Sequence, residues 1–117
     1  IINIAGETSL LEFIEIVRGS KLLIGNETSA IHIANAVNTK SICLLGGGHF
    51  GRFMPYPLKN NPFVPIPIFE ELNCFKCNWN CTIEHSEESP YPCISEISPN
   101  KVLPILKLLI KSYRNNY

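Results

Sequence analysis

Residues 21–45 read KLLIGNETSAIHIANAVNTKSICLL, and this stretch decides the fold. It contains two short apolar runs, at 21–24 and 41–45, of the kind that form strands buried within a sheet. The residues between these runs, from 27 or 28 to 37, repeat apolar positions at helical spacing. A strand, a helix and a second strand in this order predict a parallel pair joined by a right-handed crossover.

The residues before this stretch continue the alternation. Residues 1–5 are apolar enough to predict another buried strand, and residues 8–18 predict a helix with one apolar face. Thr8 or Ser9, together with Glu12, makes a capped start for that helix. Because a buried strand opens the sequence directly, we expect the chain to be the latter part of a longer protein.

The second half of the chain lacks the regular alternation of strand and helix patterns that the first half shows. Prolines restrict residues 63–69 to an edge strand, since proline cannot donate the hydrogen bonds of a central one. The cysteine-rich residues 74–93 are expected to form a loop. A serine and a proline at helix-start positions predict a C-terminal helix over residues 99–114, which Pro104 should kink or delay. The apolar stripe of this helix is expected to pack on protein rather than on a membrane.

The composition of the chain limits the classes of function that it can have. A chain of 117 residues with 45% apolar residues predicts a single α/β domain over residues 1–117. Lys plus Arg and Asp plus Glu both number 10, so there is no basic surplus for nucleic acid, and any phosphate site must be local. No transmembrane segment and no signal peptide are recognisable. We therefore expect a cytoplasmic protein, with the inner membrane face as a peripheral location.

Polar side chains mark the turn between the first predicted strand of residues 21–45 and its helix. Helix starts in parallel sheets present free amides at the edge where ligands bind, which suits a diphosphate. Thr28 and Ser29 add hydroxyls there, Glu27 precedes them, and His32 lies one turn further on the same face. The alternative is that these residues only cap the helix and that His32 is an interior histidine.

A glycine-rich loop, GGGHFGRF at residues 46–53, follows the second predicted strand of that stretch. Gly47 and Gly48 would let a ligand approach the backbone, and Arg52 offers a planar cation for phosphate. The spacing is neither that of a dinucleotide fingerprint nor that of a P-loop. Alternatively, the glycines only form turns and Arg52 pairs with a surface acid.

Four of the five cysteines gather within twenty residues, at Cys74, Cys77, Cys81 and Cys93. Thiols at this spacing can close a tetrahedral zinc site, with His85 as a substitute ligand. The alternative is a small apolar core beside Phe75 and Trp79. The odd cysteine count argues against a disulfide framework, so we expect reduced thiols here and a buried, inert Cys43.

These motifs together resemble a known family. The matching segments are residues 3–6, 8–10, 25–28, 32–34, 43–46 and 93–99. In order and spacing they are similar to the C-terminal domain of the bacterial heptosyltransferases, glycosyltransferase family 9, which transfer heptose from ADP-heptose to lipopolysaccharide core. The resemblance implies a Rossmann-like parallel sheet, the donor-binding domain of a GT-B glycosyltransferase.

The resemblance also assigns roles. In the family this turn reads Asp-Thr-Gly, two further residues and His, and contacts the donor; here Glu27, Thr28, Ser29 and His32 take those places. Glu27 is one methylene longer than the family's acid, and Ser29 stands where glycine would, so the donor need not be ADP-heptose itself. The expected diphosphate position lies between this turn and the loop carrying Gly47, Gly48 and Arg52.

Catalysis is expected to need more than this chain. The resemblance implies sugar transfer without a catalytic metal, with the acceptor domain and its general base outside these residues, so the chain alone should be inactive. Its partners would be a nucleoside-diphosphate sugar and a lipopolysaccharide-type acceptor, and zinc its one structural cofactor. Two other classes fit the sequence, a metal-stabilised interaction module and a nucleotide-sugar epimerase of similar fold.

Overall fold

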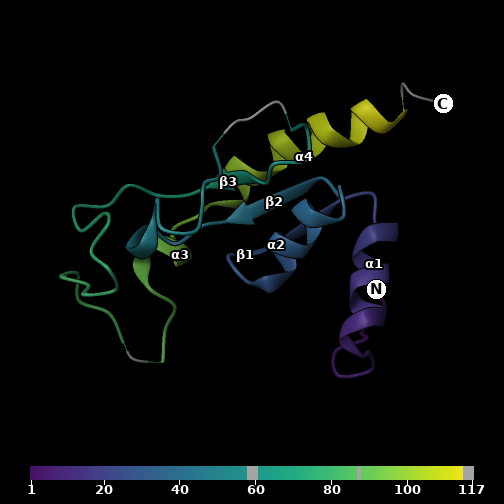
Figure 1. The fold of residues 1–117 in the computed structure, drawn as a ribbon. Coiled ribbons are helices and arrows are strands. Elements are labelled where there is room, and N and C mark those ends of the chain that lie inside the picture. The colour runs from purple at the N-terminus through teal and green to yellow at the C-terminus, as the bar shows by residue number, and fades with distance from the viewer. Residues whose placement is uncertain (58–60, 87, 115–117) are drawn as a thin grey trace. The chain divides into compact units, whose positions relative to one another are not determined.

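The computed structural model describes residues 1–57, 61–86 and 88–114, with side chains up to residue 112. Its elements are α1 (Leu10–Gly19), β1 (Leu23–Asn26), α2 (Ser29–Ala36), β2 (Ser41–Leu44), the 3₁₀ turn η1 (Gly47–His49), β3 (Ile66–Ile68), α3 (Pro92–Ser95) and α4 (Pro99–Arg114). The three strands form one parallel sheet in the order β1-β2-β3 (Figure 1). This α/β architecture confirms the predicted fold class and is consistent with a Rossmann-like domain.

The strands lie close to the positions predicted from the sequence, and one of them is offset. β2 begins at Ser41 as predicted, and the first three of its residues are buried, as expected of a central strand. β1 runs two residues later than predicted. β3 lies at an edge of the sheet, as its prolines require.

The strand predicted for residues 1–5 is wrong. These residues adopt no regular structure, and the side chains of Ile1 and Ile2 are fully exposed. Their hydrogen bonds are local: the Ala5 amide donates to Asn3 Oδ1 at 3.0 Å, and the Glu7 amide donates to the Ile4 carbonyl. An apolar run becomes a strand only where a neighbouring strand satisfies its backbone, and none of the three described strands pairs with it.

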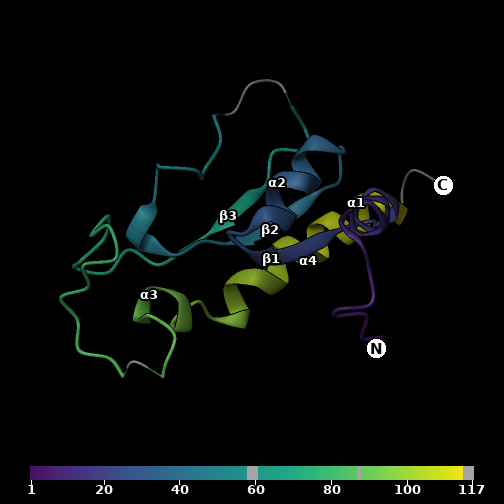
Figure 2. The same ribbon diagram turned by 60° about the horizontal axis from the view of Figure 1, so that its bottom comes forward.

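The described chain divides into two compact units within the predicted domain. The first comprises Ile1–Cys43 and Tyr56–Ile66, and the second comprises Leu44–Pro55 and Pro67–Tyr117. In the first unit α2 packs on β1 and α1 packs on α2 (Figure 2). The fully buried side chains of this unit include Ile31, Ala34, Ile42 and Cys43.

Helix α1 starts as the sequence predicts. The Ser9 hydroxyl caps the Glu12 amide, and the Glu12 carboxylate accepts from the Ser9 amide at 2.8 Å, which completes a capping box. Hydrogen bonds from the side chain and backbone of Ser9 hold the pKa of Glu12 below its ordinary value. The capping box fixes the start of the helix at Leu10.

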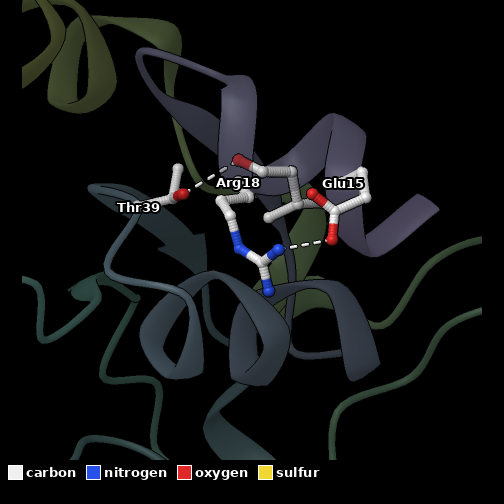
Figure 3. Close-up of polar contacts among 4 residues, drawn as sticks. Glu15, Arg18 and Thr39 are labelled. Atoms are coloured by element: carbon white, nitrogen blue, oxygen red, sulfur yellow. Dashed lines mark hydrogen bonds and ion pairs between the residues drawn. The ribbon is translucent and has the colours of Figure 1, made fainter. Parts of the chain in front are cut away.

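The far end of α1 is fixed by a buried hydroxyl. Thr39, which precedes β2, is 3% exposed and donates from Oγ1 to the Val17 carbonyl at 2.8 Å (Figure 3). This bond gives a second donor to a carbonyl at the last turn of the helix, which also accepts from the Ser20 amide at 3.1 Å. Arg18 and Glu15 form an ion pair on the exposed side of the same turn, which contributes little in water.

Helix α4 in the second unit begins at Pro99, and Ser98 Oγ accepts from the Asn100 amide at 3.1 Å. Pro104 lies inside the helix, so it does not delay the start. Four residues of the predicted stripe are half-buried, namely Val102, Ile105, Leu106 and Leu109. Within the described residues, no helix has the length and apolar character needed to span a membrane.

We expect Thr39→Val to destabilise the protein by about 0.5–1.5 kcal/mol, because the Val17 carbonyl would lose one of its two donors and keep only the Ser20 amide. Urea unfolding measures the change. Thr82→Val is the matched control, since Thr82 is exposed. Equal stability of the two variants would show that the hydroxyl does not hold α1.

Candidate functional site

The start of α2 is open to a ligand. Thr28 is the N-cap, with φ −136° and ψ 177°, and its side chain makes no capping hydrogen bond. The Thr28 carbonyl accepts from the Ile31 amide at 3.1 Å, so the capping residue contributes through its backbone alone. The first amides of a helix lack intrahelical acceptors. Thr28 and Ser29 are both exposed, so their hydroxyls border these amides at the surface.

His32 is held from its Nδ1 side. The Tyr56 hydroxyl hydrogen-bonds to His32 Nδ1, and the two rings lie 5.7 Å apart between centroids. Burial raises the pKa of Tyr56, and electrostatic interaction with Cys43 and with Glu27 adds to the effect, so the phenol keeps its proton. Tyr56 thereby fixes the ring of His32 from its Nδ1 side and leaves Nε2 for another partner.

Glu27 lies near this pair. Burial, and secondly the charge of Glu27, raise the pKa of the Cys43 thiol to about 12. Since Glu27 raises the pKa of both Cys43 and Tyr56, its carboxylate lies within electrostatic range of both groups. Cys43 is fully buried, as predicted, and stays a thiol at neutral pH. We call Glu27, His32, Cys43 and Tyr56 the Glu27 cluster.

Tyr56 is the residue that the sequence did not assign to this site. It lies 24 positions after His32, in a proline-rich segment without regular structure. Its one signal in the sequence is that Tyr56 follows Pro55 shortly after the glycine-rich loop. Residues 27, 28, 29 and 32 are brought together by one turn and one helix, as local spacing predicted.

The glycine-rich loop belongs to the second unit, where aromatic rings cover it. A Cβ at Gly46 or Gly48 would lie 2.6 or 2.7 Å from the Trp79 ring, and one at Gly47 would lie 3.1 Å from Phe75. All three glycines are buried. The structure thus gives Gly47 and Gly48 a packing role, and their contact with a donor stays a prediction.

Arg52 lies at the exposed end of the same loop. Its amide donates to the His49 carbonyl at 2.9 Å, and its guanidinium lies 5.1 Å from the centre of the Phe53 ring. Among the described residues no carboxylate forms an ion pair with Arg52, so the surface-pair alternative gains no support. An exposed guanidinium is suited to an anionic ligand.

The four clustered cysteines also lie in the second unit. Cys74 Sγ is 3.9 Å from Cys81 Sγ, and burial followed by the neighbouring thiols Cys81 and Cys77 raises the pKa of Cys74. Across the described residues, no group of three or more Cys, His, Asp or Glu side chains is arranged so that it could hold a metal ion. The predicted substitute ligand, His85, has Nδ1 at 2.9 Å from the Ile83 carbonyl.

The parallel α/β sheet, with a helix that starts at the end of a strand, is consistent with the Rossmann-like class of folds. Residues 1–94 match the model of one family, glycosyltransferase family 9 (heptosyltransferase). The chain belongs to this family, which confirms the resemblance. No curated protein and no solved structure matches it.

Gly48→Ala should destabilise the protein by about 1–3 kcal/mol, because the added methyl would overlap the Trp79 ring. Chemical unfolding followed by Trp79 fluorescence measures the loss. Gly19→Ala is the control: nothing lies within 4 Å of the added carbon, so stability should be unchanged or slightly higher. A Gly48→Ala protein as stable as the control would contradict the packing role of the loop.

Proposed function

We propose that this chain binds the donor of a glycosyltransferase, a nucleoside-diphosphate sugar of the ADP-heptose type, for transfer to a lipopolysaccharide-type acceptor. Membership of the family supports sugar transfer. The observation that carries the donor assignment is the start of α2, where the capping side chain leaves the first amides uncovered. Acceptor binding and the general base belong to the acceptor-binding part of such an enzyme, and the reaction belongs in the cytoplasm.

The diphosphate would be bound by neutral donors. Helix-start amides and the hydroxyls of Thr28 and Ser29 supply hydrogen bonds along the favourable end of the helix dipole. His32, held by Tyr56 at Nδ1, would present Nε2 to the ligand one turn further along. This arrangement needs no surplus of basic residues, in agreement with a formal net charge of zero.

Glu27 would recognise the sugar of the donor. Its carboxylate would repel phosphate at close range, so contact with the diphosphate is unfavourable unless a cation intervenes. A sugar hydroxyl, by contrast, donates to a carboxylate and gains a charge-assisted hydrogen bond. Glu27 therefore serves recognition of the sugar, and the helix start serves recognition of the diphosphate.

Glu27→Gln should weaken binding of an ADP-linked heptose by about 1.5–3 kcal/mol and change binding of ADP much less, because only the sugar donates to the carboxylate. Titration calorimetry with both ligands measures the difference. Glu7→Gln, an exposed change in a turn, is the control. Equal losses for the sugar-linked and free nucleotide would refute the role of Glu27.

Arg52→Ala tests the predicted contribution of the glycine-rich loop. If the guanidinium binds the diphosphate, ADP and the sugar donor should both lose about 1.5–3 kcal/mol of binding free energy. Arg18→Ala removes an exposed arginine that pairs with Glu15 and should leave both affinities unchanged. Unchanged affinities in the Arg52 variant would exclude it from the donor site.

A further inference from the structure

Four cysteines of the second unit share one small cavity. Cys74, Cys77, Cys81 and Cys93 all line it, together with the rings of Trp79 and Tyr91. Its volume is about 10 Å³, near the space that one water-sized sphere needs. Cys43, the remaining cysteine, does not line it. A cavity of atomic size that four cysteine residues border suits a single thiophilic cation.

The spacing of one thiol pair fits such a cation. In tetrahedral zinc sites with Zn–S bonds of about 2.3 Å, two sulfurs lie ~3.8 Å apart. The Cys74 and Cys81 sulfurs are 3.9 Å apart, whereas a disulfide would bring them to about 2.05 Å. Their separation, at which the two thiols hydrogen-bond, also matches that of two ligands of one metal. Cys77 and Cys93 would complete the set by turning into the cavity that they already line.

The backbone between these thiols is unusually bent. Lys76, Asn78 and Trp79 have φ values of 65°, 53° and 63°, a left-handed conformation that costs energy in residues with a side chain. Amides of this loop donate to the Gly47 and Gly48 carbonyls at 2.9 Å, which fixes the bend. The bend places Cys74, Cys77 and Cys81 around the cavity, and a bound cation would offset its cost.

We propose that Cys74, Cys77, Cys81 and Cys93 form a structural zinc site. On binding, each thiol releases its proton to solvent and its thiolate coordinates the ion, with no change in oxidation state. Because Cys93 lies on α3 and the other three lie on the loop, the ion ties α3 to the loop. The tie holds Trp79 against Gly46 and Gly48.

The first test measures metal in the purified, reduced chain. We expect about one zinc ion per chain by elemental analysis, and visible bands of tetrahedral thiolate coordination after exchange with Co²⁺. Trp79 is the only tryptophan, so its fluorescence reports the site directly. Removing zinc with a chelator should change this fluorescence, and adding zinc back should restore it.

Substitutions of single cysteines identify the residues that bind the metal. Cys74→Ser and Cys81→Ser should each lower zinc affinity at least about tenfold, whereas Cys43→Ser, the control outside the cavity, should retain the ion. Co²⁺ titration of the unmodified apo-chain keeps the proposal testable if a variant fails to fold.

Three results would overturn the proposal. One is an unmodified reduced chain that takes up neither zinc nor cobalt. Another is equal loss of metal in the Cys74 and Cys43 variants, which would place the ion elsewhere. The third is recovery of disulfides joining the four cavity cysteines in the native chain, detected by alkylation and mass spectrometry, which would make the cluster a covalent link.

Discussion

The Trp79 ring can lie where it does only because Gly46 and Gly48 have no side chains. The loop that carries this ring adopts left-handed backbone angles and donates two hydrogen bonds to the glycine segment below it. The cavity lined by four cysteines is enclosed by the same ring. The local structure of the second unit thus depends on one steric constraint, the absence of Cβ atoms in three consecutive residues.

This constraint explains why the glycine-rich loop was ambiguous in the sequence. Close packing of an aromatic ring and close approach of a phosphate both require a backbone without side chains. The spacing of Gly47 and Gly48 fits either use, and the ring that decides the packing role lies far along the chain. Arg52 is a different case: its guanidinium is exposed and lies 5.1 Å from the centre of the Phe53 ring, and this contact is compatible with a surface residue and with a phosphate ligand alike.

Much of the fold was predictable because its signals are local. Helical spacing predicted α1 and α2, the Ser9–Glu12 pair predicted the start of α1, and prolines predicted that β3 lies at an edge. The error at residues 1–5 has a non-local cause. Apolar composition favours a strand, but whether the backbone finds a pairing partner depends on other parts of the structure.

The candidate site likewise contains residues that local sequence signals predicted and one contact that they could not predict. Residues 27 to 32 were predictable because a turn and a helix bring them together, whereas the contact of Tyr56 with His32 depends on the path of a segment without regular structure. That contact changes the chemistry of the site. A phenol that keeps its proton holds His32 at Nδ1, and the nearby carboxylate of Glu27 would repel a small free anion at close range. Under the proposed function, the hydroxyl groups of a nucleoside-diphosphate sugar would face Glu27, and its diphosphate would lie at the start of α2, away from that carboxylate.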